Sequence, residues 1–468
     1  MCHTSGVRER FQEHLEASGL IPPGMRVLVG YSGGADSTAL LHLLHACRVD
    51  LVAGHLNHGQ RAEADEEEAK CEAFANELGV PFVSGRADVP LIAERFKIGF
   101  EEAGRQARYE FFRQAAAGLE CPLIATAHTR DDHVETVLMH LTRGAGVAGL
   151  AGIPERNEAV IRPLLPFART ETREYCEALG FWFHDDPANE DLSFARTRVR
   201  LRVLPELRIL NPEADAAIAR LASMADEESR LIDGFAAAAL EHAEIKLNGP
   251  LRFLTLDCEA AFQRELLALT PFALLRRAVR LVARVLGATL DHEQTTAVAT
   301  GLVAGTIGSV TAEGGRVVLE WDLEKLHGRD LQPVEPFRYP LTVPGEVESP
   351  EFGWRLCAGP TDPAAYERPP RSLDVVVDAA SVKGPPFFRS MADGDAMTPL
   401  GFAGTRKVAA ILGEAGLTPA AKRRLPVVCD LVGPFWLPGL CLAERVKVSP
   451  QTSQALRLVL EPIRTEVR

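Results

Sequence analysis

Several common signatures are missing from this chain of 468 residues. It contains no Gly-x-x-x-x-Gly-Lys-[Ser/Thr] segment, so it carries no Walker P-loop. Its nine cysteines include no Cys-x-x-Cys, which favours reduced thiols over a zinc ribbon or a disulfide framework. The most apolar stretch, 266–286, is interrupted by arginines, so we expect no membrane span. Together these absences predict a cytoplasmic protein.

Positive charge is also scarce, since the formal net charge is −13. An acidic protein does not bind nucleic acid indiscriminately, because such binding needs a positive field. Any RNA partner would therefore have to meet local basic patches. Residues 194–208 hold five arginines against one glutamate, and residues 405–424 hold five basic residues against one glutamate.

The composition is that of a globular protein, with 46% hydrophobic and 25% charged residues, and the length allows about three domains. Apolar strand patterns alternate with helical patterns up to about residue 202. We expect strands at 26–31, 50–56, 80–84, 122–127 and 159–164, and helices at 37–47, 62–79, 101–117, 131–142 and 169–180. This alternation predicts an α/β fold with a doubly wound parallel sheet, and ligands at the carboxyl ends of its strands.

The first strand runs into the turn Ser32-Gly-Gly-Ala-Asp-Ser37, which opens an apolar helix. Glycines allow a sharp turn and a close approach of a ligand to the main chain. The N-terminus of the helix offers free N–H groups and a partial positive charge that suit phosphate oxygens. The turn is therefore the first candidate for a nucleotide site.

A second strand-to-helix junction, 128–136, is also rich in polar groups. Asp132 and Glu135 are three residues apart and should project from one face of the helix, where they could hold an ammonium group or Mg²⁺. Arg105 and Arg108 share a helix face in the same way and are either surface arginines or a clamp for phosphate or carboxylate.

Histidines at 55, 58, 128 and 133 leave a metal site open as a weaker interpretation, since further ligands are not apparent nearby. A polar rim at the strand ends explains the same residues more simply.

The hexapeptide 32–37 resembles the PP-loop of the N-type ATP pyrophosphatases, which cleave ATP between the α and β phosphates. The wider pattern resembles the bacterial tRNA(Ile)-lysidine synthetases. It comprises His55-x-Asn-His58, Ala107-Arg-Tyr109, His128-x-x-Asp-Asp132-x-x-Glu135, Ile161-Arg-Pro-Leu164, Asp186-Pro-Ala-Asn189 and Arg196-x-x-Val-Arg200. His133, Thr197 and Cys441 depart from residues common in that family.

The resemblance implies that lysine is joined to C2 of the wobble cytidine of a minor isoleucine tRNA with anticodon CAU. It implies ATP and Mg²⁺ as cofactors, and tRNA and free L-lysine as substrates; a homodimer is compatible with it. The residues that it implies for catalysis are Asp36, His128, Asp132 and Glu135, with Asp36 also as a Mg²⁺ ligand. ATP would bind at Ser32, Gly33, Gly34, Ala35, Asp36 and Ser37.

Further residues are expected to bind substrates. Those expected to bind lysine or phosphate are Arg105, Arg108, Asp132 and Glu135. Those expected to bind tRNA are Arg196, Arg200, Arg406, Lys407, Arg423 and Arg424. We expect a catalytic domain over 1–212, a mainly helical domain over 213–331 with strands at 308–312 and 316–321, a linker over 332–346, and a β-rich tRNA-binding domain over 347–468.

Two alternatives stay open from the sequence. One is another PP-loop enzyme that amidates a small molecule. The other is a non-catalytic RNA-binding protein with a degenerate nucleotide fold. The long segment after the catalytic domain favours RNA over a small molecule, and the full set of polar groups at both junctions favours catalysis.

Overall fold

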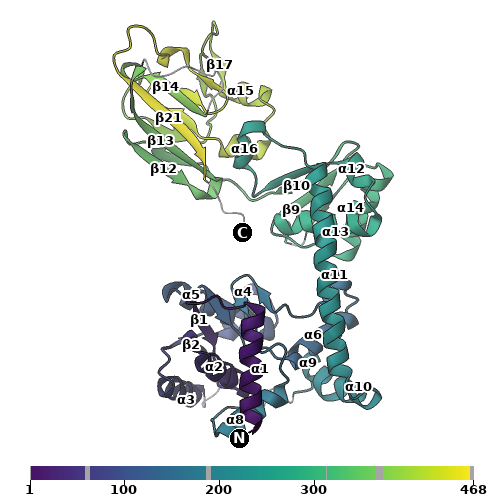
Figure 1. The fold of residues 1–468 in the computed structure, drawn as a ribbon. Helices are drawn as coiled ribbons and strands as arrows, with labels where there is room; N and C mark the ends of the chain where they lie inside the picture. Colours follow the sequence, from purple (N-terminus) through teal and green to yellow (C-terminus); the bar gives the residue numbers. More distant parts are fainter. Residues whose placement is uncertain (1, 58–63, 186–190, 313, 364–372, 464–468) are drawn as a thin grey trace. The chain divides into compact units, whose positions relative to one another are not determined.

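A computed structural model describes residues 2–57, 64–185, 191–312, 314–363 and 373–463. The chain divides into two compact units, Met1–Arg230 and Leu231–Arg468. The boundary lies within the long helix α11 (Ala214–Ala243), which is labelled in Figure 1. The finer division at residues 212 and 331 stays a prediction.

The first unit is built on a six-stranded sheet in the order β3-β2-β1-β4-β6-β5. Its strands are β1 (Arg26–Gly30), β2 (Asp50–Asn57), β3 (Phe82–Arg86), β4 (Leu123–Ala125), β5 (Arg156–Asn157) and β6 (Val160–Ile161). All neighbouring pairs are parallel except β5 with β6. The predicted α/β class with a parallel sheet is confirmed.

Helices cover both faces of this sheet, because the apolar side chains of β1 point alternately to one face and the other and are buried on both. Val27 and Val29 pack in one core cluster with leucines of α2, whereas Leu28 packs in another cluster with Phe112 of α5. Successive side chains of a strand point to opposite faces, so a strand buried on both faces is apolar throughout. The arrangement is therefore doubly wound.

The helices of this unit include the five predicted ones, which lie close to their predicted positions. They are α1 (Cys2–Ser18), α2 (Ala35–Ala46), α3 (Ala64–Glu77), α4 (Val89–Phe96), α5 (Phe100–Gly118), α6 (Arg130–Thr142), α7 (Val147–Leu150), α8 (Arg169–Leu179), α9 (Ala195–Arg198) and α10 (Leu204–Leu210), with the π-helical turn η2 (Val199–Val203) between the last two. The sequence interpretation missed α4, a short helix whose N-terminus is capped by Asp88, and it also missed the short helices α7, α9 and α10.

The strand order reverses at β1, which lies between β2 and β4. Helix α2 follows β1, and helix α6 follows β4, so both helices begin at the carboxyl edge of adjacent strands. In open parallel sheets this reversal point is where ligands bind. The fold thus brings the two polar junctions of the sequence together.

The second unit begins with helices and a small antiparallel sheet in the order β7-β10-β9-β8. Its elements are η3 (Gly249–Leu254), β7 (Glu259–Gln263), α12 (Arg264–Ala268), α13 (Phe272–Val285), α14 (His292–Ala304), β8 (Gly308–Thr311), β9 (Val317–Trp321) and β10 (Lys325–Asp330). The predicted strands at 308–312 and 316–321 are confirmed as β8 and β9, while β7 and β10 were missed.

The remainder of the second unit is rich in β-structure, as predicted. One sheet has the order β11-β15-β18-β19-β20 and another the order β12-β13-β21-β14. The strands are β11 (Arg338–Pro340), β12 (Gly345–Ser349), β13 (Trp354–Thr361), β14 (Asp374–Asp378), β15 (Phe387–Arg389), β16 (Ala396–Met397), β17 (Arg406–Lys407), β18 (Val427–Cys429), β19 (Pro434–Leu437), β20 (Cys441–Leu442) and β21 (Ala455–Pro462), with helices α15 (Val408–Glu414) and α16 (Pro419–Arg424).

One part of the expected linker 332–346 is a strand, because β11 pairs with β15. Strand β11 is at the edge of its sheet, where a proline such as Pro340 is tolerated because the N–H that it lacks is not needed for strand pairing. Among the described residues, no helix is long and apolar enough to cross a membrane.

Candidate active site

The turn after β1 has a geometry that only glycine satisfies. Gly33 has φ of +80°, and a Cβ built on it would lie 2.8 Å from the Sγ atom of Cys71. Its carbonyl accepts a hydrogen bond from the backbone N–H of His184 at 2.8 Å. Gly34 then forms the N-cap of α2 without a side-chain cap. The first amides of α2 are therefore left to a ligand, as in other anion-binding helix N-termini.

Hydrogen bonds of two serines connect the two ends of this turn. The Ser37 hydroxyl donates to the Gly34 carbonyl at 2.9 Å and accepts from the Ser32 amide at 3.2 Å. The two hydroxyl oxygens lie 3.1 Å apart. The six residues 32–37, which include Ala35 at the first position of α2, thus form one preorganised loop.

Asp36, on the first turn of α2, is the acidic group of this loop. Thr172 donates to its Oδ1 atom, and Nε of Arg169 lies 3.5 Å from its Oδ2 atom. Burial raises the pKa of Asp36 to about 6 despite these contacts. A desolvated carboxylate whose charge is only partly compensated is suited to receive a cation.

The second junction carries Asp132 at the start of α6. Its Oδ2 atom accepts the Thr129 backbone amide at 2.8 Å and the Thr129 hydroxyl at 2.9 Å. Its Oδ1 atom accepts Nη2 of Arg169 at 2.7 Å and Nη2 of Arg196 at 3.0 Å. Burial opposes ionisation, but the two guanidinium groups outweigh it and lower the pKa of Asp132. Asp132 is therefore a carboxylate that also caps its helix.

Glu135 has an exposed side-chain fraction of 0% and is surrounded by arginines. Nε of Arg196 lies 2.7 Å from Oε2, and Nε of Arg200 lies 2.6 Å from Oε1. Nη1 of Arg169 is 3.4 Å from Oε1. A buried carboxylate needs such partners, because an unpaired one would be strongly destabilising. In this structure Arg196 and Arg200, expected to meet tRNA, are engaged with the carboxylate pair.

Arg169 is the residue of this site that the sequence interpretation missed. It is the first residue of α8, and its backbone amide donates to Oδ2 of Asp131 at 2.8 Å. It contacts Asp36, Asp132 and Glu135, so it connects the two junctions. The only local signal was an arginine at the first position of a predicted helix. A positive charge there interacts unfavourably with the helix dipole, so its presence indicates that the side chain has a partner elsewhere in the fold.

His128 follows β4, and its Nδ1 atom lies 3.0 Å from the Thr126 hydroxyl. Burial lowers the pKa of His128 to about 4, and Arg108 is among the nearby charges that affect it. The imidazole is thus neutral at pH 7, and Arg108 lies within electrostatic range of it. The Arg105 guanidinium, by contrast, lies over the ring of Tyr109 at 5.9 Å from its centroid.

The structure adds no support to the weaker interpretation, in which the histidines at the strand ends form a metal site. Within the described part of the chain, no three His, Cys, Asp or Glu side chains are grouped to hold a metal. His55 is buried with Nδ1 2.9 Å from the Tyr31 carbonyl, and Nδ1 of His133 accepts the Ile153 amide at 3.1 Å. His58 and the segment 186–189 lie outside the described residues.

The expected tRNA-binding residues of the second unit differ in exposure. Arg424 is engaged internally: its guanidinium donates to the Leu254 carbonyl at 3.0 Å and pairs with Asp257, and 11% of its side chain is exposed. Arg406 pairs with Glu414. Lys407 and Arg423 are exposed, so they are the members of this patch best placed to meet a partner.

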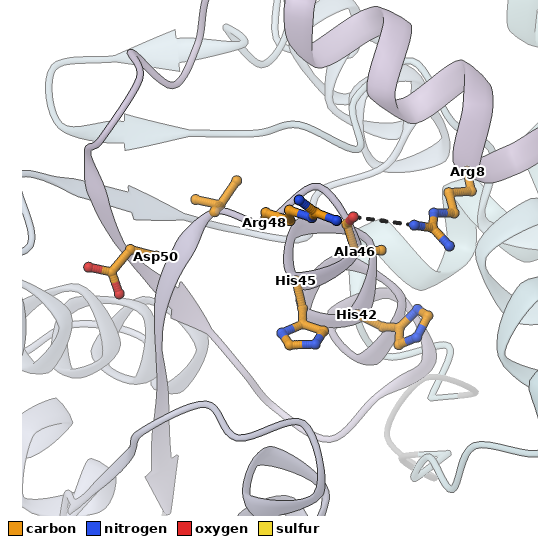
Figure 2. Close-up of a pocket in the computed structure, with 7 residues that line it drawn as sticks. Arg8, His42, His45, Ala46, Arg48 and Asp50 are labelled. Carbon is orange, nitrogen blue, oxygen red and sulfur yellow. Dashed lines mark hydrogen bonds between the residues drawn. The ribbon is translucent and has the colours of Figure 1, made fainter.

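A separate open cavity of about 600 Å³ lies at the other end of α2. Figure 2 shows the side chains that line it, among them Arg8, His45 and Asp50. Asp50 begins β2 and His45 is in the last turn of α2, so this cavity is at the amino edge of the sheet. It is therefore distinct from the site at residues 32–37.

Comparison with known proteins first defines the class. Residues 4–207 match the PP-loop domain family, which covers both junctions. The class is thus that of an ATP-binding PP-loop enzyme.

Relatives define the family, two of them over nearly the whole chain. A tRNA(Ile)-lysidine synthase of Symbiobacterium thermophilum is 32% identical over 97% of this chain and 97% of that protein. The Geobacillus kaustophilus enzyme of the same name is 31% identical over 90% and 92%. A third, from Geobacter sulfurreducens, is 43% identical over 46% of this chain and 48% of that protein. The chain belongs to the tRNA(Ile)-lysidine synthase family.

Proposed function

We propose that this protein ligates free L-lysine to C2 of the wobble cytidine of the minor isoleucine tRNA with anticodon CAU. ATP is consumed to AMP and pyrophosphate, and the product, lysidine, changes the codon and amino-acid identity of the tRNA from Met to Ile. The observation that carries the proposal is the junction of a PP-loop with a buried carboxylate pair, connected by Arg169. The family of the chain supports the same reaction.

The first half-reaction has to make a leaving group. The C2 oxygen of cytidine leaves poorly, and transfer of AMP to it gives a good leaving group. In this proposal the turn 32–37 and the first amides of α2 hold the phosphates, and the departing pyrophosphate stays on preorganised donors. Arg108 lies within electrostatic range of His128, and its guanidinium is suited to a phosphate or carboxylate of the substrates.

Asp36 fits Mg²⁺, because its carboxylate is desolvated and only partly compensated. Magnesium sites of nucleotide enzymes often use one or two carboxylates together with substrate phosphates. When bound, Mg²⁺ would neutralise charge on the phosphates. Asp36 would hold it beside the PP-loop.

The second half-reaction requires a neutral ε-amine on lysine. Asp132 stays ionised at neutral pH because of Arg169 and Arg196, so it is a weak base and a good partner for an ammonium group. Glu135 fixes the arginines around it. The neutral His128, whose Nδ1 atom lies 3.0 Å from the Thr126 hydroxyl, has a second ring nitrogen that donates or accepts a hydrogen bond according to its tautomer.

The partners and the place of the reaction follow from the substrate. A tRNA substrate puts the reaction in the cytoplasm, and exposed Lys407 and Arg423 are suited to its phosphates. The finer expectation of a homodimer is a proposal that a sedimentation measurement on the full chain would decide.

The test is a stepwise assay with purified tRNA. Incubation with ATP, Mg²⁺ and tRNA(Ile) alone should release pyrophosphate and give adenylated tRNA, and later addition of lysine should give lysidine and AMP. The same tRNA with U in place of the wobble C is the control and should release no pyrophosphate. Pyrophosphate release without any tRNA would favour a small-molecule synthetase, and no release at all would favour a non-catalytic RNA-binding protein.

A further inference from the structure

The side chain of Arg169 is shared between two sites that bind different substrates in the proposed function. Its Nη2 atom donates to Asp132 Oδ1 at 2.7 Å, and its Nη1 atom lies 3.4 Å from Glu135 Oε1. Its Nε atom is 3.5 Å from Asp36 Oδ2. The shortest contact, with Asp132, is thus on the lysine side, and the contacts with Glu135 and Asp36 are both longer.

The other arginines of the cluster are not shared in this way. Arg196 contacts Asp132 and Glu135, and Arg200 contacts Glu135. Among the ion pairs of the described residues, only those of Arg169 join α6 to the PP-loop helix α2. A change at one junction therefore reaches the other junction through this guanidinium.

We propose that Arg169 is a positioning residue that couples nucleotide binding at the PP-loop to lysine binding at the Asp132–Glu135 pair. This inference rests on the proposed function, and it adds an order of binding. Nucleotide phosphates beside Asp36 attract the guanidinium of Arg169 toward α2. The carboxylate pair then loses one counterion and binds the ammonium group of lysine more tightly. Lysine affinity is low before the nucleotide arrives.

The coupling uses the side chain of Arg169, whereas its backbone already secures the start of α8. The Arg169 backbone amide donates to Oδ2 of Asp131 at 2.8 Å, and its carbonyl oxygen lies 2.9 Å from the Thr172 hydroxyl oxygen, whose single proton can go either to this carbonyl or to Asp36. Neither backbone contact involves the Arg169 side chain. Arg169→Gln should therefore keep α8 in place and remove the shared charge.

Arg173 provides the matched control on the same helix. It lies one turn further along α8 and forms hydrogen bonds with Asp185 at 2.9 and 2.8 Å, away from the three carboxylates. Arg173→Gln removes one arginine and the same charge without touching the shared contact. Arg169→Lys keeps the charge but loses the fork that reaches two junctions at once.

The experiment measures the Kd of lysine by calorimetry with and without Mg²⁺ and α,β-methylene ATP, which cannot be cleaved between the α and β phosphates. In the natural protein and in Arg173→Gln the analogue should tighten lysine binding about five-fold or more, which is the usual range for coupled sites. In Arg169→Gln the factor should fall to about one, and Arg169→Lys should give an intermediate factor. By linkage, lysine must change the affinity of the analogue by the same factor.

An unchanged factor in Arg169→Gln, or a factor of one in the natural protein, would overturn the inference. In both cases lysidine formation by the natural protein would still support the proposed function. If the natural protein neither binds lysine nor forms lysidine, both the proposed function and the inference are overturned. If Arg169→Gln does not fold, the Arg169→Lys result decides, because a factor equal to that of the natural protein would contradict a role for the fork.

Discussion

Arg200 contacts both carboxylate oxygens of Glu135, with its Nε atom 2.6 Å from Oε1 and its Nη2 atom 3.1 Å from Oε2. Because Glu135 is fully buried, this pair determines stability as well as chemistry. Glu135→Gln leaves the guanidinium groups of Arg196 and Arg200 without their carboxylate. Removal of one partner of a buried pair costs about 3–5 kcal/mol. Urea unfolding should show a loss near the lower end of this range, since Arg200 is partly exposed; unchanged stability would contradict the pairing.

Asp36 is predicted to lower the stability of the free protein at neutral pH. Its pKa is about 6 in the fold, above the ordinary value of 3.8, so the fold favours the neutral acid. The stabilising contribution is present below about pH 4 and is lost as the pH rises through 6. Asp36→Asn should therefore be more stable than the natural protein at pH 7.5, by about 1–3 kcal/mol.

Thermal or urea unfolding in EDTA without nucleotide, from pH 4 to 7.5, measures this effect. The two proteins should have similar stabilities at pH 4 and diverge as the pH rises. The same variant should lose pyrophosphate release by about 10²–10³-fold, as expected for a missing electrostatic group. A variant that is less stable at every pH, or that keeps normal release, would contradict the assignment of Asp36.

Asp132 should matter for lysine more than for ATP. Asp132→Asn keeps an oxygen that can accept the Thr129 amide, so the cap of α6 survives, but it removes the charge that meets an ammonium group. We expect the KM for lysine to rise about ten-fold or more, since a charged hydrogen bond contributes about 1.5–3 kcal/mol. Adenylated tRNA should still form, as measured by pyrophosphate release without lysine. An unchanged KM and kcat for lysine would show that the ammonium group binds elsewhere.

The sequence predicted the parts of the site whose signals are local. The turn 32–37 and the pair Asp132 and Glu135 each follow a strand, and their residue types point to phosphate and ammonium chemistry. Arg169 was missed because its partners lie 34 or more residues away and depend on how α8 folds back onto α2 and α6. Its role is set by tertiary contacts, which no spacing in the chain reveals.

The missed strands have a similar cause. The segment of β7, Glu259-Ala-Ala-Phe-Gln263, favours a helix by composition and becomes a strand because it pairs with β10. Strand β11 lay in a stretch rich in proline, which argues against strands in general but not against an edge strand. In both cases the packing environment overrides the local preference.

The last prediction separates two neighbouring arginines of α16. Arg423 is exposed, whereas the guanidinium of Arg424 is bonded to the Leu254 carbonyl and to Asp257. Arg423→Ala should weaken tRNA binding and flatten the dependence of log Kd on log salt by about one unit, because each duplex phosphate neutralised contributes about 0.9 to that slope. Arg424→Ala should instead lower the unfolding temperature and leave the slope unchanged in the folded protein.

Filter binding of tRNA(Ile) at 50–300 mM salt measures both variants, with ATP binding as a control that should not change. Equal slopes and affinities for Arg423→Ala and the natural protein would mean that this residue is ordinary solvated surface.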